Sequence, residues 1–421
     1  GMRKFVDGLP GLGAENANNL GSYIPVAIPD TTTYPGCDYY EIELGRYEER
    51  LHSDLPPTLL AGYRQTNTSD ETVNKFHYMA PLIVSQRDRP VRITFTNNLP
   101  TGAGGDLFVP CDTTLMGAGP GPLPGESYTQ NRAVIHLHGG NSPWISDGTP
   151  HQWIVPAGEV TPYKEGPSTR NVPDMWFLGG NVIPDTVGQT TPPVPGATND
   201  PGEGSVTYYY TNQQSSRLLF YHDHALAITR LNVYVGMAAP YLITDEAEEE
   251  LIDDEIIPSE QIPLVFQDKT FVPNDMQLQA QDPTWDKAKW GGLGSLWLPH
   301  VYMPNQNPAS PDGFNAMARW HYGPWFWPPT TALVKGPQPN PYYDPVNAPW
   351  EPPEIPGTPT PSMVMESFMD TPTVNGTAYP ELEVEPNSYR FRILSVANDR
   401  SFNQQLYEAK SQAEMWDNGT L

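Results

Sequence analysis

Short runs in which apolar and polar residues alternate recur along this chain, and they predict β-strands. The clearest run covers 91–97, where Val-Arg-Ile-Thr-Phe-Thr-Asn puts apolar side chains on one face of a strand and polar ones on the other. Other runs with strand character lie at 39–44, 133–135, 205–210, 218–221, 239–244, 262–268, 382–385 and 388–394. Because these runs are short and are separated by turn residues, the pattern predicts an all-β chain.

Stretches rich in proline and glycine separate the predicted strands and predict long loops. The chain has 49 proline and 36 glycine residues among 421, and they concentrate at 101–128, 184–204 and 283–360. Aromatic residues make up 11% of the chain, whereas disordered segments are poor in them. We therefore expect a folded protein of tandem β-sandwiches. The tryptophan-rich insertion at 283–360 is expected to pack as a rigid loop rather than to border a substrate pocket.

A nearly continuous acidic run at 246–255 marks the most distinct boundary in the sequence. Like charges repel one another and stay hydrated, so this run favours a solvated linker, with a short helix as the alternative. The predicted division is an N-terminal arm at 1–37, a first β-domain at 38–246, an acidic linker at 247–261 and a second β-domain at 262–421.

The charge balance limits the classes of partner. The formal charge of −26 argues against nucleic acid and anionic membrane surfaces. No apolar run approaches the roughly 20 residues that span a bilayer, and no signal peptide is visible at the start. Cys37 and Cys111 either form one disulfide or remain two buried thiols, depending on the compartment. The compartment therefore stays open, with a periplasmic or secreted location favoured.

Two histidine pairs carry the chemistry that the sequence indicates. His136 and His138 follow the strand signal at 133–135, and His222 and His224 follow the one at 218–221. Residues i and i+2 of an extended strand point to the same face, so each pair presents two imidazoles about 7 Å apart. We expect the two strands to bring all four imidazoles into one pocket. Asp223 points to the opposite face, where it either orients neighbouring ligands through a hydrogen bond or faces solvent.

Four imidazoles favour copper over zinc. Structural zinc sites usually include cysteine and catalytic zinc sites usually take three protein ligands, whereas imidazole-rich sites suit copper. Two pairs also exceed the needs of a single open site, which indicates more than one metal ion. The isolated His52, His77, His300 and His321 are expected to be structural or solvent-facing.

The sequence around the two pairs resembles the first two copper motifs of multicopper oxidases. These motifs are His-Leu-His-Gly-Gly at 136–140 and Tyr-His-Asp-His-Ala at 221–225. The likeness is strongest to bacterial laccase-like enzymes of the spore-coat laccase, bilirubin oxidase and phenoxazinone synthase type. Segments that strengthen it, the last two by resembling the second cupredoxin domain of that family, lie at 143–153, 210–214, 229–236, 372–376 and 389–394.

The resemblance implies tandem cupredoxin-like Greek-key β-sandwiches with long loops and a distinct role for each histidine. His136 corresponds to a ligand of the type 2 copper. His138, His222 and His224 correspond to ligands of the binuclear type 3 copper pair.

The resemblance also implies a catalytic carboxylate. Asp147 corresponds to an acidic residue that lies near the side from which dioxygen enters and that assists proton delivery. The alternative is a turn or N-cap aspartate in front of Gly148. His151, close by in sequence, corresponds to no ligand position.

A complete three-domain member of the family has parts that this chain lacks. Its third cupredoxin domain carries a His-Pro-x-His-x-His segment and a His-Cys-His segment, and the latter holds the type 1 copper. Here no histidine follows His321, and neither cysteine has a histidine beside it. We therefore expect the second domain to be incomplete, the third domain to lie elsewhere in the same or a separate polypeptide, and this chain to supply half of the trinuclear copper ligands.

The implied function is that of a laccase-like multicopper oxidase. Such an enzyme couples one-electron oxidation of phenolic, aromatic amine, tetrapyrrole or metal-ion substrates to four-electron reduction of dioxygen to water. Dioxygen, a small reducing substrate and the missing third cupredoxin domain are the expected partners. The alternatives are a non-enzymatic copper-binding or copper-sequestering cupredoxin protein and an inactive fragment.

Overall fold

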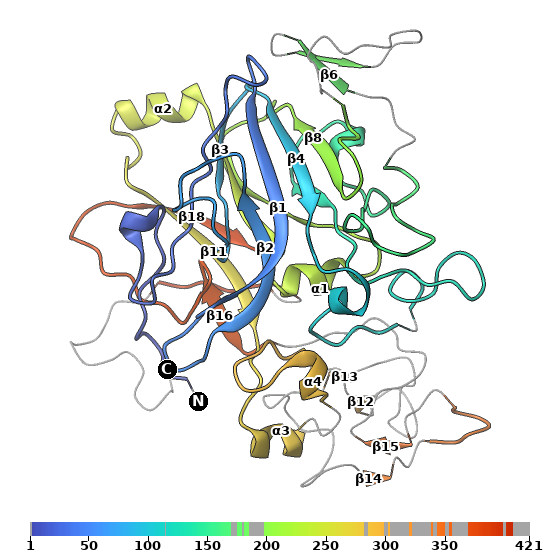
Figure 1. The fold of residues 1–421 in the computed structure, drawn as a ribbon. Helices are drawn as coiled ribbons and strands as arrows, with labels where there is room; N and C mark the ends of the chain where they lie inside the picture. Colours follow the sequence, from blue (N-terminus) through green and yellow to red (C-terminus); the bar gives the residue numbers. More distant parts are fainter. Residues whose placement is uncertain are drawn as a thin grey trace.

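The protein consists mainly of β-strands. The computed structural model describes residues 2–113, 115–169, 175–178, 181–184, 198–281, 285–298, 302–303, 320–321, 338–339, 343–349, 353–355, 369–398 and 401–406. In these residues the strands form three four-stranded sheets and three two-stranded pairs, and the few helices are short (Figure 1). The predicted all-β class is confirmed.

The first sheet has the strand order β2-β1-β4-β8. β1 (Asp38–Glu49) pairs antiparallel with β2 (Thr58–Gln65) and parallel with β4 (Val91–Asn97), and β8 (Ser205–Tyr210) pairs antiparallel with β4. β4 and β8 have the bounds that the sequence predicts. The alternation in β4 sends Ile93 and Phe95 into the core, where both side chains are fully buried.

The second sheet has the order β3-β10-β9-β5. It contains β3 (Ile83–Gln86), β5 (Ile135–His138), β9 (Arg217–Asp223) and β10 (Ala238–Thr244). The first two sheets share one hydrophobic core. Within it, the ring of Tyr63 from β2 lies 5.4 Å from the ring of Tyr221 from β9, measured between centroids. These two sheets therefore pack face to face, as the predicted sandwich requires.

The third sheet has the order β17-β16-β11-β18. Its strands are β11 (Gln261–Lys269), β16 (Thr371–Val374), β17 (Thr377–Ala378) and β18 (Arg390–Ser395). The strand predicted at 382–385 is wrong, because only Glu381 forms a single bridge, to Gly8. Pro380 and Pro386 flank that segment and donate no backbone hydrogen bond, which works against a ladder there.

The acidic run forms a helix, α2 (Glu246–Asp253), and not the solvated linker that its charge favours. Asp245 caps the helix by accepting a hydrogen bond from the Glu248 backbone N–H at 2.9 Å. Glu248 itself is buried and forms ion pairs with Arg390 and Arg392 of β18. The helix therefore connects the second and third sheets through a buried carboxylate. The predicted domain boundaries stay a prediction.

Other elements are short. The helices are η1 (Ala14–Asn16), η2 (Gly102–Gly105), η3 (Trp144–Ser146), α1 (Thr229–Tyr234), α3 (Asp275–Gln281) and α4 (Lys287–Trp290). The paired strands are β6 (Met175–Leu178) with β7 (Asn181–Pro184), β12 (Tyr302–Met303) with β13 (Trp320–His321), and β14 (Gln338–Pro339) with β15 (Glu354–Ile355). Among the described residues, no helix combines the length and apolar character that a membrane crossing requires.

Part of the tryptophan-rich insertion packs against the preceding segment, and the rigid loop over 283–360 stays a prediction. Trp285 and Trp297 are buried and form a small apolar cluster with Val272 and Leu278. His300 and the aromatic residues Trp325, Phe326 and Trp327 of this insertion lie outside the described residues.

The two cysteines are free thiols. Cys37 is buried against tyrosine side chains and Cys111 is half-buried, and they are not bonded to each other. Burial raises the pKa of both thiols to about 12, so both stay protonated at neutral pH. Of the two alternatives that the sequence leaves open, the structure has the free thiols.

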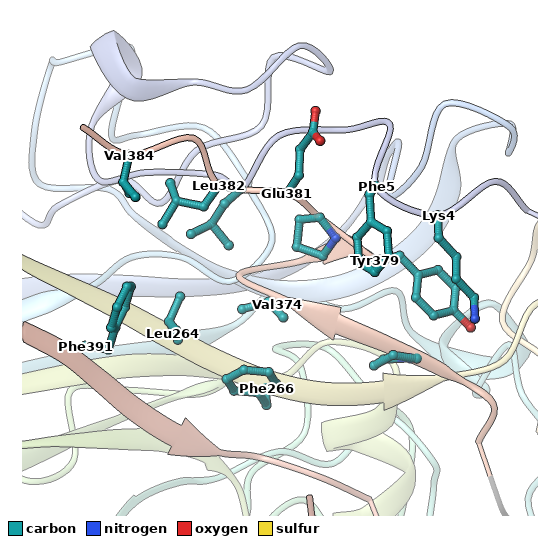
Figure 2. Close-up of a pocket in the computed structure, with 13 residues that line it drawn as sticks. Lys4, Phe5, Leu264, Phe266, Val374, Tyr379, Glu381, Leu382, Val384 and Phe391 are labelled. Atoms are coloured by element: carbon teal, nitrogen blue, oxygen red, sulfur yellow. The ribbon is translucent and has the colours of Figure 1, made fainter. Parts of the chain in front are cut away.

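One face of the third sheet carries an apolar groove of about 610 Å³ (Figure 2). Leu264, Phe266 and Val374 point into it from the strands, and Phe5 of the N-terminal arm covers one end. At the other end, Phe391 has 45% of its surface exposed. An apolar surface of this kind is typical of a face that packs against a further element or partner.

Candidate metal centre

The structure brings the four predicted histidines together at one edge of the second sheet. β5 and β9 are paired in a register that sets His136 directly opposite His222. Ligand atoms of His136, His138 and His222 all lie within 4.8 Å of one another. The ring of His224 stacks on that of His136, with 4.8 Å between centroids. Two strands that are distant in sequence therefore gather the imidazoles at a single point.

His224 reaches the cluster in a different way from the one that the sequence predicts. β9 ends at Asp223, so His222 lies within the strand and His224 lies just beyond it. In β5 both His136 and His138 belong to the strand, as expected. Alternation along β5 thus places the first pair on one face, whereas the turn after β9 positions the last histidine.

Three of the imidazoles have their Nδ1 atoms fixed by backbone carbonyl groups. A carbonyl oxygen only accepts hydrogen bonds, so each of these Nδ1 atoms carries the proton and each Nε2 keeps a free lone pair. The Nδ1···O distances are 2.5 Å from His136 to Asp147, 2.6 Å from His222 to Asp223 and 3.2 Å from His224 to Gly148. This arrangement leaves Nε2 as the ligand atom, as in many metal-binding histidines.

The fourth imidazole, that of His138, turns Nδ1 rather than Nε2 toward the cluster. Its Nδ1 lies 3.2 Å from Nε2 of His222. Its ring stacks on Phe220, with 4.8 Å between centroids. His138 is exposed at the rim of the cluster, whereas His222 is buried. The nitrogens of these two residues therefore converge on one region.

The surroundings favour the neutral form of the His138, His222 and His224 imidazoles. Burial lowers the pKa of His222 to about 3, and the neighbouring imidazoles act in the same direction. Burial also lowers the pKa of His138 and of His224. Only a neutral imidazole can donate a lone pair to a metal ion, so at neutral pH these three side chains are in the form that binds metal.

Asp147 lies beside the cluster at the end of η3. Its backbone carbonyl holds His136, and its carboxylate Oδ1 lies 3.7 Å from Nδ1 of the same imidazole. The carboxylate is 36% exposed, so it contacts both the cluster and solvent. Asp147 thus occupies the turn that one alternative predicts and also lies at the cluster, which the other requires.

Gly148 is a further residue of the centre, which the sequence does not identify as such. Its φ is +69°, and a Cβ atom there would lie 1.8 Å from the carbonyl oxygen of Ile135. The backbone therefore needs glycine to approach β5 this closely while its own carbonyl holds His224. The positive φ has no local sequence signal beyond the glycine itself.

His52, His77 and His151 lie apart from the cluster. His151 is exposed and joins none of the four rings. His52 is buried, and its Nε2 donates to the carbonyl oxygen of Arg3 at 2.8 Å, which ties the N-terminal arm to the loop after β1. His77 packs against Tyr23 and lies 3.6 Å from Glu49. His52 and His77 are therefore structural in this fold.

Asp223 faces the interior and not solvent. Its side chain is fully buried, and burial raises the pKa of its carboxyl group to about 6. It accepts hydrogen bonds from the Val134 and Ala225 backbone N–H groups and from the Asn232 amide. Of the two alternatives for this residue, the structure has the hydrogen-bonded one.

Comparison with known proteins gives consistent relatives by sequence. No family model matches the chain. It is 27% identical over 412 residues to a laccase of Bacillus subtilis (strain 168) and 29% identical over 407 residues to a laccase of Bacillus stratosphericus. Each alignment covers 96% of this chain and 52% of the relative. The chain thus spans about half the length of these curated relatives.

Solved structures include the McoA multicopper oxidase of Aquifex aeolicus. It aligns at a TM-score of 0.42 and 18% identity, over 95% of this chain and 47% of that one. By sequence, the chain is similar over nearly its whole length to curated laccases, and over 87% of its length to a multicopper oxidase of Oryza sativa at 25% identity.

Proposed function

We propose that this chain forms part of a laccase-like multicopper oxidase, an oxidoreductase that uses dioxygen as its electron acceptor. The observation that carries the proposal is the cluster of His136, His138, His222 and His224, which presents four imidazoles at one edge of a sheet. The laccases among its relatives by sequence support the same class of reaction.

The donor set fits copper. Three imidazoles have Nδ1 bonded to a carbonyl, which leaves the lone pair of Nε2 for a metal ion, and burial favours the neutral state of His222. We assign His136 to the type 2 copper and His138, His222 and His224 to the type 3 pair. The 3.2 Å approach of His138 Nδ1 to His222 Nε2 supports the binding of one type 3 ion by both residues.

The reaction balances as four one-electron oxidations of a small reducing substrate against the reduction of one dioxygen, with four protons, to two waters. Copper, when bound, supplies the redox chemistry. The protein orients His136, His222 and His224 through carbonyl groups, and burial favours the neutral form of His222 and His224. Asp147 is proposed to hold and deliver protons from its carboxylate, because that group is half-exposed and lies 3.7 Å from His136.

Further ligands are proposed to come from outside this chain. Four histidines are half of the eight that the trinuclear cluster requires by the family resemblance, and a type 1 copper needs a cysteine flanked by histidines. A third cupredoxin domain is the proposed source, on the same or a separate polypeptide. The apolar groove over the third sheet supports the presence of further packing elements (Figure 2).

Copper stoichiometry on the full chain tests the ligand set. We expect His136→Ala and His222→Ala to lose copper in an equilibrium titration. His77→Ala is the matched control, because its side chain is 18% exposed, as that of His136 is. Unchanged copper binding by His136→Ala and His222→Ala would refute the assignment.

Dioxygen consumption by the complete protein tests the reaction. We expect copper-loaded protein to consume dioxygen when a phenol or aromatic amine is supplied, and His222→Ala to abolish this consumption. Copper binding without any dioxygen consumption would instead favour the copper-sequestering alternative.

A further inference from the structure

A network of buried polar residues lies directly behind the histidine cluster. Asp223 is its centre, and its carboxylate accepts three hydrogen bonds. Oδ1 accepts from the backbone N–H of Val134 at 3.0 Å. Oδ2 accepts from the backbone N–H of Ala225 at 3.0 Å and from the side-chain amide of Asn232 at 2.9 Å. One side chain thus joins the start of β5, the turn after β9 and helix α1.

These bonds occur where backbone pairing ends. The last paired position of the β5–β9 ladder is Ile135 with Asp223, so the ladder does not extend to His224. The only backbone contact of the His224 N–H that continues the pairing is a 3.3 Å hydrogen bond to the carbonyl of Val134. Ladder hydrogen bonds fix the backbone at His222. Next to His224, the carboxylate of Asp223 fixes the backbone instead, by bonding to Val134 and Ala225.

Two more buried residues complete the network. Asn232 also donates from the same amide nitrogen to the carbonyl of Arg132 at 3.1 Å. The Arg132 guanidinium donates to the carbonyl of Leu226 at 3.2 Å and attracts the Asp223 carboxylate. Both side chains are fully buried. The turn at 224–226 is therefore held by Asp223 through the N–H of Ala225 and by Arg132 through the carbonyl of Leu226.

We propose that Asp223 is a positioning residue for the metal centre, whose carboxylate fixes the His224 imidazole relative to those of His136 and His222. This inference rests on the proposed copper function. Two carboxylate oxygens are required, because the three donors arrive from two sides. An amide at this position offers one oxygen and turns an NH2 group toward donors, which leaves buried N–H groups unpaired.

The test compares Asp223→Asn with Asp7→Asn in the full chain. Asp7 is a matched control because it is equally buried and accepts hydrogen bonds from the Ser53 backbone N–H and the Asn19 amide at 2.8 Å each. Both variants are expected to lower the unfolding temperature. Only Asp223→Asn is expected to weaken copper(II) affinity, by at least tenfold, and to change the copper electron paramagnetic resonance spectrum.

A metal-free measurement separates this proposal from the proposed function. Hydrogen–deuterium exchange of the peptide that contains 224–226 is expected to become at least tenfold faster in Asp223→Asn and to stay unchanged in Asp7→Asn. A second possible result is faster exchange while copper binding does not depend on His136 or His222. That result would support the role of Asp223 in holding the turn and would refute the assignment of copper to these histidines. Parent-like exchange and copper affinity in Asp223→Asn would overturn the positioning role itself.

A milder variant covers the case in which Asp223→Asn does not fold. Asn232→Ala removes one donor and leaves the carboxylate bonded to the two backbone N–H groups. We expect a copper affinity between that of the parent and a tenfold loss, with faster exchange at 224–226. Exchange and affinity equal to those of the parent would contradict the network.

Discussion

Lys269 at the end of β11 is expected to make the stability of the protein depend on pH, and Lys269→Met should remove that dependence. The side chain is fully enclosed, and its Nζ donates to the carbonyl oxygen of Tyr234 at 2.6 Å. The rings of Tyr78 and Tyr234 each have their centroids 5.0 Å from Nζ. Asp268 is the nearby acid that attracts the ammonium group.

Burial is the larger influence and lowers the pKa of Lys269 from 10.5 to about 7. Between these two values the unfolded chain holds a proton that the folded chain has released. Stability therefore rises with pH across this window, by at most about 1.4 kcal/mol per pH unit. Between pH 7.5 and pH 9.5 the contribution of this one residue amounts to about 2.5 kcal/mol.

Urea unfolding of the full chain at several pH values, monitored by tryptophan fluorescence, measures the contribution of Lys269 to the free energy of unfolding. The difference in unfolding free energy between the parent and Lys269→Met should change by about 2.5 kcal/mol over that range. Lys289→Met is the control, since its side chain is 73% exposed. If the curve of Lys269→Met ran parallel to that of the parent, the account of a lysine that is neutral when folded would be wrong.

Three further predictions concern the centre and the contact between sheets. Gly148→Ala should cost about 2–4 kcal/mol and weaken copper binding, because its Cβ would collide with a carbonyl 1.8 Å away. Gly158→Ala is the control, because its φ is +79° and no atom lies within 4 Å of the added Cβ; it should lower the unfolding free energy by only about 1 kcal/mol in thermal unfolding. Equal losses of stability in the two variants would contradict the proposed collision at Gly148. Glu248→Ala should lower the free energy of unfolding by about 3 kcal/mol, because it leaves two arginines without their buried partner. The control Glu250→Ala, at an exposed position, should lower it by nothing measurable. A Glu248→Ala protein as stable as the parent would show that the ion pairs contribute little. Copper at 100 times its dissociation constant should stabilise the parent by about 2.7 kcal/mol, and a chelator should reverse this stabilisation. His136→Ala should not be stabilised by copper. Equal stabilisation of that variant would mean that copper binds elsewhere.

The sequence predicts the elements whose determinants are local. β4 has the predicted bounds because alternation along the strand indicates which of its faces is buried. Helix α2 could not be predicted in the same way. Its acidic composition favours solvent, and the arginines that make burial of Glu248 possible lie more than 140 positions away, at 390 and 392.

In the candidate site, too, the sequence predicts only the features whose determinants are local. The spacing of His136 and His138 on a strand predicts a shared face without knowledge of the fold. By contrast, the hydrogen bonds that hold His224 come from Gly148 and, through the turn, from Asp223, and only the folded chain brings these groups together. Sequence spacing thus identifies the imidazoles, whereas their orientation is a property of tertiary contacts.

The register of β5 against β9 restricts how this protein can change over evolutionary time. Side chains on a strand alternate, so inserting or deleting one residue before His136 or His222 within either strand would turn an imidazole to the opposite face. Exposed turns such as the one around Gly158 can gain or lose residues at little cost. In descendants of this chain, changes in length should therefore accumulate in the loops, while the two short strands keep their length as long as the cluster is in use.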